Sequence, residues 1–177
     1  MKLLTRRERE ALRETFCPAR IRILFVGEAP PVSGRFFYSA NSGLYRAMRD
    51  VFKAVNASIN DENFLSLFQA SGCYLTDLCP KPVDHLDPGS RRRARIAGEA
   101  LLSETLIRLR PEKIAPVLRA IVSHVANAAS RANWRGEIIE LPYPGRWYRH
   151  RAEFVKALEP TIQALFRQHR RSRPLWI

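Results

Sequence analysis

Short apolar runs alternate along this chain with longer segments in which apolar residues recur every three or four positions. Continuous runs of β-forming residues at 21–26 and 73–78 are typical of strands buried on both faces, and 113–118 and 136–141 are weaker candidates. Between the runs we expect helices at 3–16, 42–55, 61–69, 90–109, a segment ending near 129, and 150–168. This alternation predicts an α/β protein, a three-layer α/β/α domain with a central, mainly parallel four-stranded sheet.

Local signals refine the boundaries of these elements. Ser42 or Asn41 can cap one helix, Asp61 is expected to cap the next, and Ser90 is expected to open the long one. Pro116 weakens the third strand because proline has no N–H to donate. No repeat or linker divides the sequence, so residues 1–177 are expected to form one domain.

The loops that follow three of the predicted strands carry the distinctive chemistry. The first reads Gly27-Glu28-Ala29-Pro30-Pro31 and is followed by Phe37, the second begins at Asp77, and the fourth spans 142–147 with aromatic and cationic side chains. In a parallel sheet these loops meet at one edge. An acid that can hold a water beside an aromatic face suits removal of a planar base from a sugar. A solvated glutamate and core phenylalanines would give the same local sequence.

The charge of the chain indicates a polyanionic partner. Thirty Lys and Arg residues stand against seventeen acids, which gives a formal net charge of +13 and a pI near 10.6. Arginine predominates, and its forked guanidinium suits contacts to phosphate. Nucleic acid is therefore the first expectation and an anionic membrane surface the second, while a merely solubilising basic surface stays open.

Other classes of protein are disfavoured. Three cysteines without CxxC spacing make a disulfide framework or a four-cysteine cluster unexpected, and no His, Cys and carboxylate set has metal-ligand spacing. No apolar run approaches the roughly 18 residues of a membrane span, and residues 1–14 lack the apolar core of a signal peptide. We therefore expect a cytoplasmic protein with no membrane partner, no metal and no cofactor.

These motifs resemble those of the uracil-DNA glycosylase superfamily. Residues 27–31 are similar to its first motif, closest to the Gly-Glu-Ala-Pro-Gly of the thermostable iron–sulfur branch, and 34–37 resemble the Gly-Arg-Pro-Phe that follows there. Residues 43–45 fall where that branch has a short helix, and 76–82 resemble a Thr-Asn strand-end motif. Tyr-Pro-Gly at 143–145 stands where the family has His-Pro-Ser or His-Pro-Ala. The order of the motifs agrees over nearly the whole chain.

The resemblance implies roles for individual residues. Glu28 would orient or deprotonate the attacking water and stabilise positive charge on the deoxyribose, and Tyr143 would take the place of the histidine that bonds the departing base. Phe37 would stack on the flipped base and Asp77 would read its Watson–Crick edge. The implied base-binding residues are Gly27, Ala29, Phe37 and Asp77.

Contacts to DNA are expected from basic residues and from a wedge that fills the duplex. Trp147 or Arg146 would be the wedge, and the arginines that open the helix at 90–109 are candidates for phosphate contacts, as is the basic tail 167–173. An ordinary solvated basic face would give the same runs. The expected DNA-binding residues are Lys81, Arg91, Arg92, Arg93, Gly145, Arg146 and Trp147.

Four departures from the family pattern matter for the chemistry. An ionised Asp77 can only accept hydrogen bonds, whereas uracil presents an acceptor at O4 and a donor at N3. Either Asp77 is protonated by burial, or a backbone amide donates to O4, or the preferred base is not uracil. Tyr143 has no imidazole, so stabilisation of the leaving base must come from its hydroxyl, from Arg146 or from backbone amides. Pro31 replaces a glycine and removes a backbone donor. Cys17 and Cys79 echo ligand positions of the iron–sulfur branch, but a four-thiolate site cannot form, so we expect a cluster-free member.

The leading hypothesis is a monofunctional, monomeric DNA glycosylase that excises uracil or a related deaminated base and starts base excision repair. The alternative is a non-catalytic nucleic-acid-binding module that kept the glycosylase fold, motivated by the missing histidine and the altered asparagine. A hydrolase of free nucleosides or nucleotides is a third class, but it would not explain a charge of +13.

Overall fold

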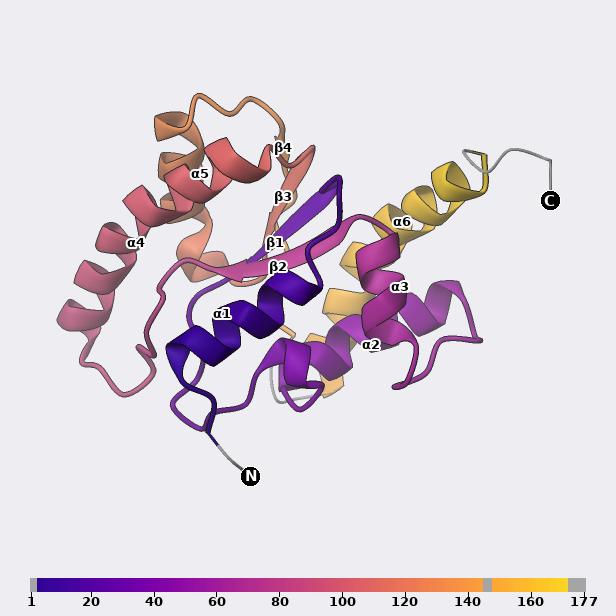
Figure 1. The fold of residues 1–177 in the computed structure, drawn as a ribbon, viewed down its shortest axis with the longest axis horizontal. Coiled ribbons are helices and arrows are strands. Elements are labelled where there is room, and N and C mark those ends of the chain that lie inside the picture. The colour runs from indigo at the N-terminus through magenta and orange to yellow at the C-terminus, as the bar shows by residue number, and fades with distance from the viewer. Residues whose placement is uncertain (1–2, 145–147, 172–177) are drawn as a thin grey trace.

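The computed structural model describes residues 3–144 and 148–171 and has a four-stranded sheet at its centre (Figure 1). Its order is β2-β1-β3-β4, and each neighbouring pair is parallel. The strands are β1 (Ile23–Gly27), β2 (Cys73–Asp77), β3 (Lys113–Pro116) and β4 (Glu137–Ile138). The predicted parallel, four-stranded sheet is confirmed.

Helices cover both faces of this sheet. They are α1 (Arg6–Thr15), α2 (Gly43–Val55), α3 (Phe64–Ala70), α4 (Pro88–Leu109), α5 (Val122–Arg131) and α6 (Tyr148–Arg171), with 3₁₀ turns η1 (Phe37–Ser39) and η2 (Arg119–Ile121). Helices α4 and α5 lie on one side, α2, α3 and α6 lie on the other, and α1 runs beside the edge strand β2 (Figure 1). This is the predicted three-layer α/β/α arrangement.

Two predicted helix starts are wrong. Asp61 does not cap α3: its carboxylate accepts a hydrogen bond from Arg49 at 2.6 Å, and Asn60 caps the preceding turn by accepting from the backbone N–H of Asn63 at 3.1 Å. The long helix α4 begins at Pro88, not at Ser90, because the Asp87 side chain caps it by accepting the backbone N–H of Ser90 at 3.0 Å.

The fourth strand is much shorter than predicted. The sequence suggested 136–141, but β4 pairs with β3 only over Glu137–Ile138, extended by one bond from the backbone N–H of Ile139 to the carbonyl of Ile114 at 2.8 Å. The next donor along β3 would be residue 116, and Pro116 has no N–H. The chain beyond Ile139 is therefore released from the sheet and reaches Tyr143 as a loop.

The pairing of β1 with β2 positions the residues of greatest interest. Strand β1 is buried throughout, and its last residue, Gly27, lies opposite Asp77 at the end of β2. Two further bonds continue the ladder: Leu78 donates to the carbonyl of Gly27 at 2.8 Å and Cys79 to that of Glu28 at 2.7 Å. Glu28 therefore begins a loop whose backbone is still hydrogen-bonded to the chain that follows β2.

A buried polar cluster joins α4 to α5 behind the sheet. The Glu99 carboxylate, 4% exposed, lies 2.6 Å from Nδ1 of His124 and accepts from Asn127 at 3.1 Å, and Arg131 lies 3.3 Å away. Burial alone would raise the pKa of Glu99, but the hydrogen bonds from His124 and Asn127 outweigh it and lower the pKa.

We expect Glu99→Gln to reduce the free energy of unfolding by about 1–3 kcal/mol at neutral pH, because the partners of a buried acceptor lose a charged hydrogen bond. A lowered pKa in the folded state stabilises the fold above the ordinary carboxyl pKa, and this contribution disappears as the pH falls through the lowered value. Urea titrations of both proteins at neutral and strongly acidic pH measure this. A difference that stays constant across pH would contradict the assignment.

Candidate active site

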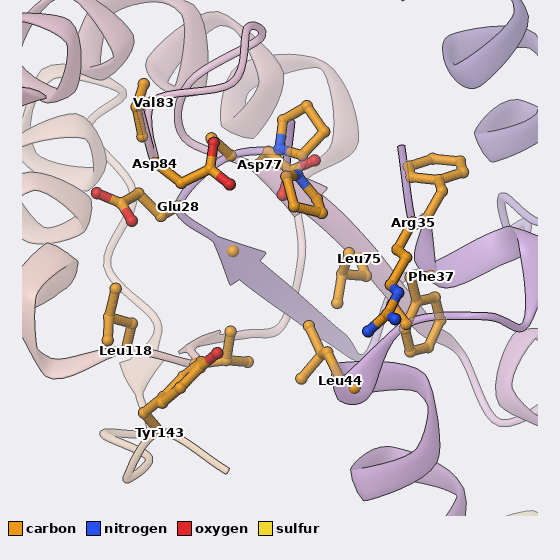
Figure 2. Close-up of a pocket in the computed structure, with 18 of the residues that line it drawn as sticks. Glu28, Arg35, Phe37, Leu44, Leu75, Asp77, Val83, Asp84, Leu118 and Tyr143 are labelled. Atoms are coloured by element: carbon orange, nitrogen blue, oxygen red, sulfur yellow. The ribbon is translucent and has the colours of Figure 1, made fainter. Parts of the chain in front are cut away.

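A pocket of about 420 Å³ lies at the carboxyl edge of the sheet, where β1 and β2 end. This volume is in the range of small-molecule sites in proteins. Figure 2 shows Glu28 and Asp84 on one side of the pocket, Arg35 and Phe37 on the opposite side, and Tyr143 below them. Loops that are far apart in the sequence thus meet at one cavity, as expected for parallel strands.

Glu28 is held in the wall of this pocket by two arginines of α4. Its Oε1 accepts from Nε of Arg91 and from Nε of Arg95, both at 2.7 Å, and its Oε2 accepts from Nη2 of Arg91. Nη2 of Arg95 forms an ion pair with Oε1 at 2.6 Å. Residues four apart on a helix share a face, which is why both guanidinium groups reach the same carboxylate. The Glu28 side chain is only 10% exposed.

Burial and ion pairing act in opposite directions on Glu28. Burial would raise its pKa, but the hydrogen bonds and charges of Arg91 and Arg95 dominate and hold the pKa below its ordinary value. The carboxylate is therefore ionised at neutral pH and is a weak base. With two guanidinium groups on one carboxylate, the cluster carries a net positive charge.

Asp77 faces the same pocket from the end of β2 and has an arginine partner of its own. Its Oδ2 accepts from Nη2 of Arg13 in α1 at 2.5 Å, and Arg13 also donates to both oxygens of Glu10. A Cβ on Gly27 would lie 2.7 Å from Oδ1 of Asp77, so the glycine leaves the space in which this carboxylate lies. The lack of a side chain at Gly27 thus permits the close approach of Asp77.

The charge of Asp77 depends on two opposing effects. Burial raises its pKa above the ordinary value, while the Arg13 guanidinium works against that shift. Arg13 is 8% exposed and lies 5.5 Å from the ring centroid of Phe36. An ionised Asp77 is the natural partner for this buried cation, since an arginine does not lose its proton in proteins.

Phe37 contributes to the pocket wall and to the hydrophobic core at once. It is 3% exposed, and its ring centroid lies 5.0 Å from that of Tyr38 and 5.2 Å from that of Phe68. Phe36 is equally buried and also lines the pocket. Truncating Phe37 would therefore empty part of the core, so loss of binding in such a variant would not by itself demonstrate stacking.

The remaining walls include an exposed tyrosine and a third carboxylate. Tyr143 is 57% exposed and lines the pocket together with Ala29. Asp84 accepts the backbone N–H of Val32 with both oxygens at 3.2 Å, which ties the loop after β1 to the loop after β2. This contact braces the two loops that form the mouth of the cavity.

The residues expected to bind DNA fall into three groups. Arg91 is paired with Glu28 inside the pocket wall. Lys81, Arg92 and Arg93 are exposed, and Arg93 donates to the Ser90 hydroxyl at 2.8 Å. Gly145, Arg146 and Trp147 lie outside the described residues, so the proposed wedge has no structural account here.

Sequence reasoning did not predict Asp84 in the pocket wall, or Arg13 and Arg95 as partners of the two pocket carboxylates Asp77 and Glu28. Arg13 gave no signal, because nothing local connects α1 to the end of β2. Asp84 lay unremarked in a loop of turn-forming residues. Arg95 had a readable signal: its spacing of four from Arg91 predicts that both side chains lie on one helix face. Within residues 3–144 and 148–171, no group of three or more His, Cys, Asp or Glu could hold a metal ion.

Comparison with known proteins gives the family. The model of the Uracil DNA glycosylase superfamily matches residues 14–166 of the chain. Because the match covers most of the sequence and the fold agrees with it, the chain belongs to this superfamily, which supports a glycosylase-type function on DNA in general. No curated protein matches the chain. No helix in the described part is long and apolar enough to cross a membrane.

Proposed function

We propose that the protein is a monofunctional DNA glycosylase that hydrolyses the N-glycosidic bond of uracil, or of a related deaminated base, in DNA and so starts base excision repair. The observation that carries the proposal is the pocket at the ends of β1 and β2, lined by Glu28 and Asp77, in a chain that belongs to the Uracil DNA glycosylase superfamily. A net charge of +13 suits a DNA substrate. We further propose that residues 1–177 act as one monomeric, cytoplasmic domain without a cofactor.

The proposed mechanism divides the reaction between the two sides of the pocket. Glu28 orients the attacking water: its Oε2 accepts from Arg91, which leaves a lone pair for a water hydrogen. Its low pKa keeps it an acceptor at neutral pH, so its main contribution is preorganised orientation rather than strong basicity. Tyr143 would offer its hydroxyl to the base from the opposite loop.

Base recognition is proposed for the deeper part of the pocket. Phe37 forms a flat wall on which the extruded base stacks, Asp77 contacts the edge of the base, and Gly27 and Ala29 line the pocket beside it. Lys81, Arg92 and Arg93 would contact backbone phosphates outside the pocket. Arg146 or Trp147 would fill the gap left in the duplex.

The test is release of base from defined oligonucleotides. Strands with one uracil, hypoxanthine or xanthine, single- and double-stranded, are incubated with the protein, treated with alkali and scored for cleavage at the abasic site. We expect cleavage only after alkali, since a monofunctional enzyme leaves the strand intact. Cleavage before alkali would instead indicate lyase chemistry, for which Lys81 would be the first candidate. Free nucleosides in parallel test the third class.

A second candidate function is a nucleic-acid-binding module without turnover. The observation that favours it is the double pairing of Glu28 with Arg91 and Arg95, which occupies most of the acceptor capacity of the carboxylate. The same assay separates the two: binding to the oligonucleotides without release of any base supports the module and overturns the glycosylase.

A further inference from the structure

The cluster of Glu28, Arg91 and Arg95 carries a net positive charge. This charge suits stabilisation of an anion and not of a sugar cation. Two guanidinium groups lie within hydrogen-bond distance of one carboxylate, and the side chains of Glu28, Arg91 and Arg95 are 10%, 35% and 17% exposed. Breaking an N-glycosidic bond produces both a cation on the sugar and an anion on the base. A preorganised cation in a water-poor pocket lowers the barrier when it faces the anion.

The way in which Arg91 binds Glu28 leaves one edge of its guanidinium available. Glu28 accepts from Nε and Nη2 of Arg91, and in a planar guanidinium Nη1 then lies on the opposite edge with two further hydrogens. Arg91 lines the pocket and is the more exposed of the two arginines. Glu28 therefore orients the Arg91 guanidinium, with its free edge towards the cavity.

From this geometry we infer that Arg91 is a second catalytic residue of the proposed reaction, donating from its guanidinium to the base as the base leaves as an anion. The inference rests on the proposed function. In the step, the electron pair of the C1′–N bond departs with the base and the oxygen of water bonds to C1′. Water loses one proton to solvent, and the base anion finally gains one from solvent. The reaction is a hydrolysis and requires no further reactant.

Arg91 also offers a replacement for the histidine whose place Tyr143 takes in the family pattern. The hydroxyl of Tyr143 carries no charge at neutral pH, whereas a guanidinium supplied by α4 would stabilise the departing base from another direction. Its charge does not titrate in the working range: Glu28 raises the pKa of Arg91 above an already high value. We therefore expect leaving-group stabilisation that persists into alkaline pH.

The experiment compares bases that leave with different ease. Single-turnover release of uracil and of 5-fluorouracil, whose N1 anion is more stable, is measured with the parent protein and with Arg91→Met. We expect Arg91→Met to slow uracil release about a hundredfold, as for loss of one charge-stabilising donor, and to slow 5-fluorouracil release several-fold less. Arg91→Lys, which keeps the charge, should recover part of the loss and guards against misfolding of the methionine variant.

Arg95→Met is the matched control, because Arg95 also binds Glu28 and is not part of the pocket lining. Its rate loss should be equal for the two bases. Equal loss for both bases in Arg91→Met, or no loss, overturns the inference and leaves Arg91 as a phosphate contact or a holder of Glu28. The same dependence on the base in Arg95→Met also overturns it. A parent protein that binds DNA and releases neither base overturns the proposed function, and this inference with it.

Discussion

Replacing Glu28 with glutamine is expected to lower base release at least about a hundredfold while DNA binding persists. The amide has nearly the same shape, but it lacks the charge that holds Arg91 and Arg95 and it presents one N–H₂ to their donors. Both the orientation of the water and the orientation of the arginines are lost together. Single-turnover release from a uracil-containing strand measures the effect.

The binding of DNA by this variant gives a second readout. Removing the carboxylate frees two guanidinium groups, so affinity for DNA should stay the same or rise, and its salt dependence should become steeper. Asp84→Asn is the matched control because it removes the same charge from the same pocket and leaves the hydrogen bonds of Arg91 and Arg95 to Glu28 in place. A Glu28→Gln protein with nearly normal turnover would exclude Glu28 from the chemistry. An equal loss of turnover in Asp84→Asn would mean that Glu28 contributes only a negative charge to the pocket, without a specific role.

The sequence was sufficient to predict the fold and the meeting of the strand-end loops. Continuous apolar runs identify strands buried on both faces, and parallel strands separated by helices bring their carboxyl ends to one edge. Glu28 and Asp77 each follow such a run directly, so their proximity follows from topology alone. The ends of the strands were predicted less accurately, because they depend on the neighbouring strand. The length of β4, for example, depends on the missing N–H of Pro116 in β3.

The partners of these carboxylates could not be predicted in the same way. Asp77 binds Arg13 and Glu28 binds Arg91, over separations of 64 and 63 residues. Which of thirty basic residues reaches a given acid depends on how α1 and α4 pack, and no local pattern encodes that. Phe37 illustrates the converse case, since a residue that suits a stacking wall by sequence is also largely enclosed by Tyr38 and Phe68.

Asp77→Asn is expected to increase uracil release about fivefold to tenfold at neutral pH, the worth of about one hydrogen bond. Arg13 favours the ionised form of Asp77, which can only accept and therefore repels O4 of uracil. The amide restores a donor at this position. Thermal unfolding of the variant should show a cost, because the buried Arg13 loses its charged partner and keeps only Glu10.

The pH profile distinguishes this role from others. Burial raises the pKa of Asp77, so in the parent protein uracil release should rise as the pH falls through that value and the protonated acid becomes a donor. Release should fall again at lower pH as Glu28, whose pKa is lowered, takes up its proton. The Asp77→Asn variant should lack the rise in release that comes from Asp77 and keep the fall at lower pH that comes from Glu28. Steep loss of activity in the variant at every pH would mean that Asp77 positions water, and a profile identical to that of the parent would place Asp77 outside base recognition.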